Sequence, residues 1–353
     1  MKKVAIVDIS RWKRAKIKPF FPNESVYFLS HQSDLVEAFE KIVIWGRKEF
    51  NRIETFAKKK HIPIYRMEDG FIRSVSLGVD FSQPYSLIID KRGIYFDATQ
   101  ESDLEYILST YNFDESLLER AEKIRQYLVE NKLSKYNIYD NRPIEIDNKA
   151  YARTILVIGQ VEGDASLIYG ADNMKNLELL QSVKRDNLNS YIIYKPHPDV
   201  LTGKREGNIV ESRALNYCHQ IEKEVGIDAL LSLVDEVHTM TSLVGFEALL
   251  RGKNVVCYGM PFYAGWGLTI DKLKIERRTR KLKLLELVAG TYILYPKYID
   301  PKTLQLCEIE RVLEVLSKEK ELYHNSLLYR VKIKIKNFLT IKYYAVLRHI
   351  LKD

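Results

Sequence analysis

Four short stretches of the chain carry side chains suited to chemistry, and each one follows a strand-like apolar run. They are EDGFIRS (68–74), GQVEGDAS (159–166), YKPHPDV (194–200) and TSLVGFE (241–247). Their carboxylates can transfer protons or attack a substrate, and their cations and hydroxyls can bind phosphate. In open α/β sheets, ligands bind at the carboxyl ends of the strands. The four stretches therefore predict ligand sites at such edges.

The first stretch places Glu68 and Asp69 directly before Gly70, with Arg73 close behind. Two carboxylates at a sheet edge can supply an acid or a base, and an arginine can balance or orient them. Asp-Gly is also an ordinary turn signal. Both interpretations stay open at this point.

The second stretch is a tight turn between a strand and a helix. Gly159, Gln160 and Gly163 form this turn, whose glycines allow backbone N–H groups to approach a ligand closely. Asp164 then lies at the strand end, where it can face that ligand. An aspartate in this position also suits the N-cap of the next helix.

The third stretch holds Lys195 and His197 between two prolines. Pro196 and Pro198 fix their own φ angles and restrict the residues before them. A rigid cationic pair is a suitable clamp for phosphate. The alternative is a structural histidine in a stiff turn.

The fourth stretch predicts a helix capped by Thr241 and Ser242, whose first N–H groups and positive dipole end suit a phosphate. Glu247 lies inside this helix, where a carboxylate can reach a ribose. The loop at 259–269, GMPFYAGWGLT, contains Trp266 and is suited to packing against sugar or base faces. This layout is similar to nucleotide-sugar sites in glycosyltransferases with two Rossmann domains.

Two series of alternating strands and helices position these stretches. The first series consists of strands at 3–9, 25–30, 41–46 and 62–70, helices at 33–41 and 47–60, a hairpin at 85–99 with its turn at 91–93, and helical residues at 103–135. The second consists of strands at 153–160 and 190–195, a strand near 229–240, a helix at 242–252 and a strand at 254–261. The polar, turn-rich residues 136–150 are the candidate linker between them.

The predicted fold class is therefore α/β, with two doubly wound, Rossmann-like halves and a ligand site in the cleft between them. We predict an N-terminal domain at 1–150 that carries the acidic turn and a second domain at 151–325 that binds the donor. Residues 326–353 form a basic C-terminal tail. The N-terminal MKKVAIVDIS predicts a first strand rather than a signal peptide, and no apolar run is long enough to span a membrane.

The net charge of the 353-residue chain is +8, which implies an anionic partner. Nucleic acid is not expected, because the basic residues are spread along the chain with no aromatic-rich basic platform outside the tail. The three cysteines, Cys218, Cys257 and Cys307, stand singly, which argues against disulfides and zinc and predicts a reducing cytosol.

The tail combines basic and apolar side chains, and its only acid is Asp353. That composition suits an amphipathic element on an anionic membrane surface. A C-terminal helix that packs on the body and exposes a basic face fits equally well.

Taken together, the motifs resemble those of the capsular-polysaccharide β-Kdo transferases. The similar runs, in chain order, are WGRK (45–48), EDGFIRSVSLG (68–78), PYSLIIDKRGIYFDATQESDLE (84–105), KPHPD (195–199) and SLVGFEALLRGKNVVCYGMPFYAGWGLT (242–269). The resemblance covers residues 40–300 and includes long, specific motifs. It implies a GT-B fold, two Rossmann-like domains facing a central cleft, that takes Kdo (3-deoxy-D-manno-octulosonic acid) from CMP-Kdo.

The resemblance also implies the acceptor and the location. Members of the family build the β-Kdo linker between lyso-phosphatidylglycerol and a capsule chain, and they include a protein with two such modules in tandem, of which this chain contains one. The implied partners are CMP-Kdo, a lipid-linked or Kdo-terminated acceptor and an anionic membrane surface. The implied place is the cytoplasmic face of a Gram-negative inner membrane, with peripheral attachment.

By the same resemblance, His197 and Lys195 contact the CMP phosphate, and the His-Pro and acidic-acidic-Gly motifs are shared with bacterial sialyltransferases. The full set implied in donor binding is Arg73, which would pair with the Kdo carboxylate, Gly159, Gln160, Lys195, His197, Thr241 and Ser242 for the phosphate, Glu247 for the ribose, and Trp266. No metal and no cofactor are implied, because CMP leaves with one phosphate that these groups can stabilise.

Family members retain the donor stereochemistry, for which a covalent sugar–carboxylate adduct has been proposed. A two-step displacement needs a nucleophilic carboxylate and a separate acid/base. Asp164 is the first choice for the nucleophile. Asp90, Glu68 and Asp69 are the candidates for the acid/base, in no fixed order.

Two other functions are compatible with these motifs. One is a transferase of another CMP-activated ulosonic acid such as sialic acid, which would use the same phosphate and cytidine contacts. The other is a non-catalytic scaffold of capsule export that keeps the fold and binds only a lipid-linked glycan.

Overall fold

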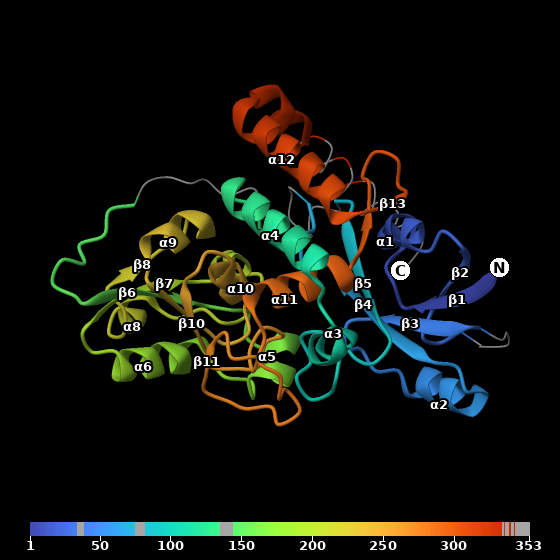
Figure 1. The fold of residues 1–353 in the computed structure, drawn as a ribbon, viewed down its shortest axis with the longest axis horizontal. Coiled ribbons are helices and arrows are strands. Elements are labelled where there is room, and N and C mark those ends of the chain that lie inside the picture. The colour runs from blue at the N-terminus through green and yellow to red at the C-terminus, as the bar shows by residue number, and fades with distance from the viewer. Residues whose placement is uncertain are drawn as a thin grey trace. The chain divides into compact units, whose positions relative to one another are not determined.

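The chain folds into two compact units, each assembled from separate segments (Figure 1). The computed structural model describes residues 1–33, 39–74, 82–134, 144–333, 335, 339 and 342. The first unit comprises Met1–Ile94, Gln126–Ile138 and Thr291–Asp353, and the second comprises Tyr95–Arg125 and Tyr139–Gly290. These units group residues 95–125 and 291–325 differently from the predicted domains. Of the predicted linker, residues 136–143 lie outside the described residues.

The first unit is built on one seven-stranded sheet with the order β13-β12-β5-β4-β3-β1-β2. Its elements are β1 (Lys2–Val7), α1 (Arg11–Ile17), a 3₁₀ turn (Lys18–Phe20), β2 (Glu24–Leu29), β3 (Lys41–Trp45), α2 (Asn51–Lys60), β4 (Ile64–Asp69), β5 (Ser86–Asp90), β12 (Lys297–Ile299), β13 (Leu306–Cys307) and α12 (Ile309–Asn325). Strands β2, β1, β3 and β4 are parallel, whereas β5, β12 and β13 join in antiparallel pairs. Of the helix predicted at 33–41, residues 34–38 lie outside the described residues.

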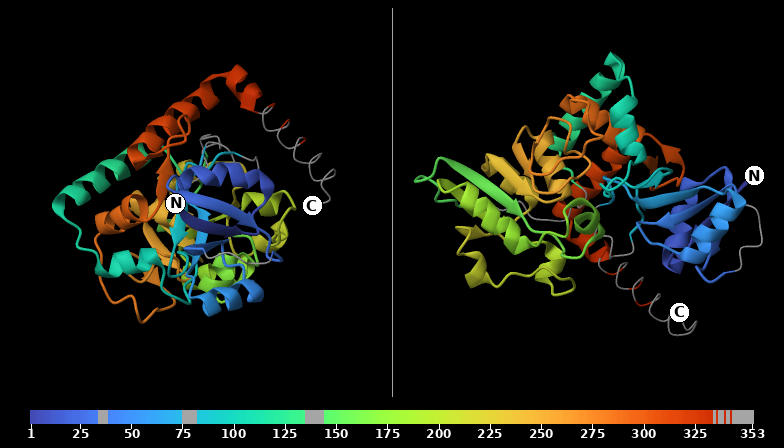
Figure 2. Two further views of the ribbon diagram at one scale, coloured as in Figure 1. Left: turned by 90° about the vertical axis from the view of Figure 1, so that its right-hand side faces the viewer. Right: turned by 90° about the horizontal axis from the view of Figure 1, so that it is seen from below.

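Alternation along β1 explains how this sheet is covered. Val4 and Ile6 pack in one cluster with Ile17 of α1, whereas Ala5 and Val7 pack in another with Ile53 of α2. Successive side chains of a strand point to opposite faces, so β1 places α1 and α2 on opposite sides of the sheet. Figure 2 (left) shows this layering.

The hairpin predicted at 85–99 is wrong. Strand β5 pairs antiparallel with β4 and β12, and no strand follows it at 91–100. The buried carboxylate of Asp90 accepts hydrogen bonds from the backbone N–H groups of Arg92 and Gly93, both at 2.9 Å. This turn carries the chain away from the sheet instead of folding it back.

The second unit contains a parallel six-stranded sheet with the order β11-β10-β9-β6-β7-β8. Its strands are β6 (Arg153–Ile158), β7 (Ser190–Lys195), β8 (Gln220–Ile221), β9 (Glu236–Thr239), β10 (Asn254–Cys257) and β11 (Ile270–Asp271). Its helices are α3 (Asp103–Thr110), α5 (Ala165–Gly170), α6 (Asn176–Asp186), α7 (Pro198–Leu201), α8 (Glu211–Ala214), α9 (Ile227–Leu233), α10 (Leu243–Leu250) and α11 (Leu284–Val288). Helix α4 (Glu115–Glu130) and a π-helical turn (Ala289–Leu294) contain two of the points where the chain passes between units.

This strand order is that of a doubly wound Rossmann sheet, as predicted. Side chains of α5, α6 and α8 pack together on Ile155, Val157 and Ile192 of β6 and β7. Helices α9 and α10 lie on the opposite face, as Figure 1 shows. The order reverses between β6 and β9, and such a reversal is where open α/β sheets hold their ligands.

The tail predicted at 326–353 is described only in part. Residues 327–333 are helical, and of the later residues only 335, 339 and 342 belong to the described part of the chain. Among the described residues, no helix is both long and apolar enough to cross a bilayer.

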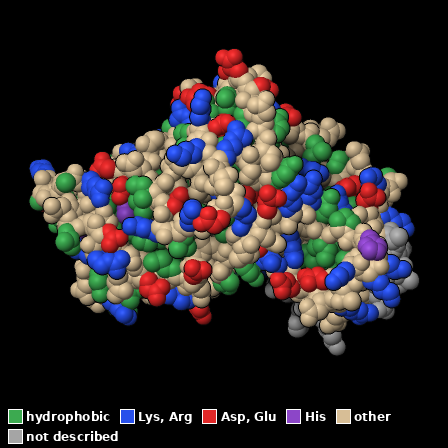
Figure 3. Space-filling model, turned by 60° about the horizontal axis from the view of Figure 1, so that its bottom comes forward, with side chains coloured by type: hydrophobic (Ala, Val, Ile, Leu, Met, Phe, Trp, Pro, Cys, Tyr) green, Lys and Arg blue, Asp and Glu red, His purple; other side chains and the backbone are tan. Residues whose placement is uncertain are grey.

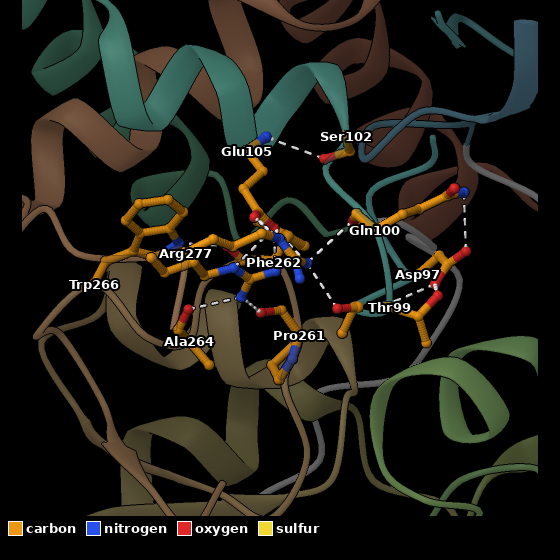
Figure 4. Close-up of polar contacts among 12 residues, drawn as sticks. Asp97, Thr99, Gln100, Ser102, Glu105, Pro261, Phe262, Ala264, Trp266 and Arg277 are labelled. Carbon is orange, nitrogen blue, oxygen red and sulfur yellow. Dashed lines mark hydrogen bonds and ion pairs between the residues drawn. The ribbon is translucent and has the colours of Figure 1, made fainter. Parts of the chain in front are cut away.

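A buried carboxylate holds residues 95–125 to the rest of the second unit (Figure 4). Glu105 pairs with Arg277, and its Oε2 lies 3.0 Å from Arg278 Nε. Arg277 also donates to the carbonyls of Ala98 (2.7 Å) and Gln100 (3.1 Å). Since Glu105 and Arg278 are only 4% and 7% exposed, the buried guanidinium of Arg278 depends on Glu105 as its ion-pair partner.

We therefore expect Glu105→Gln to destabilise the protein strongly. The substitution leaves the buried Arg278 without its ion-pair partner, and breaking such a pair costs about 3–5 kcal/mol. The free energy of unfolding in urea measures this loss. Glu119→Gln, which removes the same charge from an exposed site on α4, is the matched control. A loss no larger than that of the control would contradict a structural role for the ion pair.

Candidate active site

The site begins at the reversal of strand order, where Gln160 after β6 faces Thr241 after β9. Gln160 Nε2 donates to Thr241 Oγ1 (2.9 Å), and Thr241 N donates to Gln160 Oε1 (2.8 Å). The backbone of Gln160 is fixed as well, because its N–H donates to Asn176 Oδ1 at 2.8 Å. One amide side chain thus links the segments that follow the two strands.

A continuous set of hydrogen bonds leads from Thr241 to Asp164. Thr241 Oγ1 lies 3.2 Å from Ser166 Oγ, and Ser166 donates to Asp164 Oδ1 from both its hydroxyl (2.9 Å) and its backbone N–H (3.0 Å). Asp164 is the N-cap of α5, so the capping interpretation is correct. Capping uses Oδ1 only, and no hydrogen bond to Oδ2 is found among the described residues. The half-buried carboxylate is therefore oriented and still has one oxygen for chemistry.

His197 is the N-cap of α7, and this fixes its tautomer. Its Nδ1 accepts a hydrogen bond from the backbone N–H of Asp199 at 3.1 Å, so the proton of the neutral ring is on Nε2. Burial lowers the pKa of His197, while the nearby charges of Asp199 and Asp164 oppose that shift. The structure thus brings His197 and Asp164 near each other, with Nε2–H available as a donor.

Lys195, at the end of β7, has a different partner from the one predicted. Its ammonium donates to the carbonyl of Lys223 at 2.9 Å, and the side chain is 8% exposed. Burial lowers its pKa to about 8, with partial compensation from Glu222 and Glu224. This placement argues against Lys195 and His197 acting together as a phosphate clamp.

Ser242 caps α10, as the sequence predicts, and accepts a hydrogen bond from Val244 N at 3.2 Å. Glu247 lies in the second half of the same helix and is 6% exposed. Burial raises the pKa of Tyr263, and the charge of Glu247 adds to that shift. Gly159 is needed for packing, because a Cβ there would lie 2.6 Å from the Tyr194 hydroxyl. Gly163 has φ +77°, which favours glycine in the turn before Asp164.

Trp266 belongs to the interior of the second unit. Its side chain is fully buried, its indole N–H donates to the Phe262 carbonyl at 2.8 Å, and the Arg278 guanidinium lies 5.6 Å from its ring centroid. Figure 4 shows Trp266 beside the ion pair. This placement argues against contact between Trp266 and a donor sugar or base.

The acidic turn lies at the end of β4, in the first unit. Arg73 is 1% exposed and donates to Asp69 Oδ2 at 2.9 Å, so it orients that carboxylate and is poorly placed to pair with a ligand. Asp90 is fully buried and also accepts from the Tyr295 hydroxyl at 2.6 Å, which argues against an acid/base role. Glu68 remains half-buried at the strand end, and its Oε1 accepts from Asp69 N at 3.0 Å.

Two residues of the site were missed in the sequence. Ser166 links Asp164 to Thr241, and its place two residues after an N-cap aspartate is a local signal that could have found it. Asn176 holds the backbone of Gln160 from sixteen residues away, through both its side-chain oxygen and its side-chain nitrogen. No local pattern predicts that contact.

Comparison with known proteins identifies the family of this chain. A family model described as "Capsule polysaccharide biosynthesis protein" matches residues 40–298. The chain belongs to this family. A similar relative is the "Capsule polysaccharide modification protein LipA" of Neisseria meningitidis serogroup A, 47% identical over 328 residues, which are 91% of this chain and 46% of LipA. The "Lipopolysaccharide-processing protein LpsZ" of Rhizobium meliloti is 37% identical over 90% of this chain and 74% of its own. The chain thus spans about half the length of LipA.

Two solved structures share the fold of this family member. "Thermosulfurimonas dismutans KpsC, beta Kdo 2,7 transferase" has a TM-score of 0.73 and 39% identity, over 90% of this chain and 100% of its own. "Thermosulfurimonas dismutans KpsC, beta Kdo 2,4 transferase" has a TM-score of 0.77 and 33% identity, over 89% of this chain and 98% of its own. The two-domain, GT-B-like fold and the resemblance to β-Kdo transferases are thereby confirmed.

The pKa of Lys195 gives a pH-dependent prediction. Between pH 8 and pH 10.5 the folded chain binds fewer protons at Lys195 than the unfolded chain does. The free energy of unfolding therefore increases as the pH rises through this window. Lys195→Met removes that gain, and its stability relative to wild type should fall by about 2–3 kcal/mol across the window. Urea unfolding at several pH values measures this. Lys204→Met, at an exposed site, should show no such trend. A constant difference for Lys195→Met would contradict the lowered pKa.

Proposed function

We propose that this chain is a retaining β-Kdo transferase that moves Kdo from CMP-Kdo to a lipid-linked or Kdo-terminated acceptor in capsular polysaccharide linker synthesis. The observation that carries the proposal is the set of hydrogen bonds from the strand reversal to Asp164, with His197 nearby. The family and the activities for which the two KpsC structures are named support the sugar and the linkage.

The second unit binds the donor in this proposal. His197 donates from Nε2–H to the CMP phosphate, and the start of α10 at Ser242 adds N–H groups to the same anion. Gln160 and Thr241 link the ends of β6 and β9 beside it. Glu247 remains the proposed ribose contact. Lys195 does not contact the phosphate in this proposal; it links the end of β7 to the carbonyl of Lys223, which follows β8.

The reaction proceeds by two displacements. Oδ2 of Asp164 attacks the anomeric carbon of Kdo, and the bond to the phosphate oxygen breaks, so that CMP leaves with the electron pair. An acceptor hydroxyl then attacks the same carbon, its proton passes to the acid/base, and the Asp164 carboxylate is released. Each step inverts once, so the β configuration is retained. Glu68 is our acid/base, because Asp90 is fully buried and Asp69 is paired with Arg73.

The proposed steps use only side chains and helix N–H groups to stabilise the leaving phosphate. No metal ion and no cofactor take part in them. Within the described residues, no group of three or more His, Cys, Asp or Glu side chains is arranged as a metal site.

The test is incubation of the purified chain with CMP-Kdo and a synthetic β-Kdo glycoside, followed by NMR and mass spectrometry. We expect a β-linked product and a Kdo adduct on Asp164. Asp164→Asn should lower transfer about 10⁴-fold, as loss of a residue in a catalytic group does. Asp172→Asn, a matched change at an exposed position of the same unit, should leave transfer unchanged.

Three results would overturn parts of this proposal. An α-linked product would exclude retention, and an adduct on another carboxylate would exclude Asp164. Transfer from CMP-sialic acid but not CMP-Kdo would mean a different ulosonic acid. If CMP-Kdo were neither transferred nor hydrolysed, a glycan-binding scaffold would become the better interpretation.

We also propose peripheral attachment to the cytoplasmic face of the inner membrane through the basic tail. Deletion of residues 327–353 should abolish sedimentation with vesicles of phosphatidylglycerol while transfer to a soluble acceptor persists, because each basic side chain near an anionic surface contributes about 1 kcal/mol. Vesicles of phosphatidylcholine are the control for charge. If the deletion leaves vesicle binding intact, or if it also removes transfer to the soluble acceptor, the tail is part of the folded body instead.

A further inference from the structure

A lysine and two tryptophans lie together at the carboxyl edge of the first sheet. Helix α1 follows β1, and the ammonium of Lys13 lies 3.5 Å from the ring centroid of Trp45 at the end of β3. The same ammonium is 5.4 Å from the ring of Trp12. All three side chains are partly exposed, so a ligand can reach them.

Lys13 lacks a close anion in the described part of the chain. No hydrogen-bond acceptor or ion-pair partner contacts its ammonium there, and burial lowers its pKa against the weaker attraction of Asp69 and Glu68. Asp69 is already paired with Arg73 at 2.9 Å. A partly desolvated cation over an aromatic ring gains some stabilisation from the ring, but less than from a hydrogen-bonded anion.

Lys48, another cation on this edge, has a carboxylate partner. Lys48 contacts Asp8 Oδ2 at 3.5 Å, and His31 Nδ1 lies 3.0 Å from Asp8 Oδ1. Lys and Arg side chains are frequent over the first unit, at the right of Figure 3. Lys13 differs from Lys48 because it faces two indole rings instead of a carboxylate.

This edge also carries the proposed acid/base. Gly46 directly follows Trp45, and an added Cβ there would lie 3.6 Å from Glu68 Oε2. Gly46 N donates to the Met67 carbonyl at 2.8 Å, which fixes Trp45 and Glu68 on adjacent strands. A molecule that gives its proton to Glu68 therefore lies beside Trp45 and Lys13.

We propose that Lys13, Trp12 and Trp45 form the subsite for the oxyanion of the acceptor, with the indole rings packing on its sugar or glycerol carbons. The ligand chemistry is a carboxylate or phosphate next to a hydroxylated carbon chain. It comes either from a terminal acidic sugar or from a glycerophospholipid headgroup. The inference rests on the proposed function for its acceptor and assigns three residues that the donor site does not use.

The kinetic test compares Lys13→Gln and Lys13→Arg with wild type. Acceptors are a β-Kdo octyl glycoside, its carboxyl-reduced analogue and lyso-phosphatidylglycerol. We expect Lys13→Gln to raise KM for at least one anionic acceptor about ten-fold, the effect of one charge-assisted hydrogen bond, and Lys13→Arg to restore part of it. Hydrolysis of CMP-Kdo without acceptor should stay within about two-fold, because the donor contacts lie in the second unit. Lys58→Gln, exposed on α2, is the charge-matched control.

The anionic acceptor whose KM rises identifies the source of the oxyanion. The reduced analogue should bind wild type and Lys13→Gln equally weakly. If KM rises for neither anionic acceptor, or rises as much for the reduced analogue, the subsite is refuted and Lys13 is a structural cation.

Acceptor binding can also be measured without any donor. Of the three tryptophans, Trp266 is fully buried, so a change of fluorescence on titration with acceptor reports on Trp12 and Trp45. We expect saturable quenching in wild type, a Kd about ten-fold higher in Lys13→Gln, and loss of most of the signal in Trp45→Phe. Quenching without transfer from CMP-Kdo would refute the proposed function while the subsite stands. If transfer occurs, but acceptor causes no quenching and Lys13→Gln has no effect, the subsite is refuted while the proposed function stands.

Discussion

The reversal of strand order between β6 and β9 is the constraint on which the site depends. On either side of this reversal the crossover helices lie on opposite faces of the sheet, so the segments that follow the two strands turn away from each other. Gln160 spans the opening with one donor and one acceptor to Thr241. An unpaired buried amide would cost about 1–3 kcal/mol, so both groups are held. Through Ser166 the same constraint positions Asp164.

The second unit also depends on a segment that precedes it in the chain. Residues 95–125 contribute Glu105, which neutralises Arg277 and Arg278 beside the Trp266 loop. Ala98 N donates to the Tyr169 carbonyl at 3.1 Å, so the same segment contacts α5, the helix that Asp164 caps. The ion pair and Asp164 therefore belong to one folded assembly.

The sequence was most informative where a strand end and a helix cap coincide. Gly, Asp or Ser after an apolar run indicates where the strand ends. For this reason the sequence placed Asp164, His197 and Ser242 correctly at the edge of the sheet. Partners far along the chain leave no such signal. Periodicity could not show that β5 pairs with β12, more than two hundred residues later, and the predicted hairpin failed for that reason. Trp266 was misjudged similarly, because aromatic-rich loops look alike whether their rings are buried or exposed.

Lys13 and Trp45 were also beyond sequence reasoning, since β3 and α1 are brought together only by the sheet order β3-β1-β2. The roles of Arg73 and Asp90 changed for a related reason. A charged residue at a strand end is a candidate for chemistry until its partners are known. The partner of Arg73 is Asp69, which the turn after β4 brings close, and the partner of Asp90 is Tyr295, which only the tertiary fold brings close. Burial then separates structural charges from reactive ones.

The proximity of Asp164 to His197 suits the proposed first step electrostatically. Before reaction, the Asp164 carboxylate opposes the effect of burial on the pKa of His197. When Oδ2 forms the bond to the sugar, Asp164 loses its charge while the departing phosphate gains one. The negative charge thus moves from a carboxylate whose field already acts on the imidazole to the phosphate that the ring is proposed to bind. Because Nδ1 accepts a hydrogen bond from Asp199 N, the ring is fixed, and Nε2–H can donate to the departing phosphate without a rotation of the ring. Little reorganisation is then needed, which is the advantage of a preorganised site.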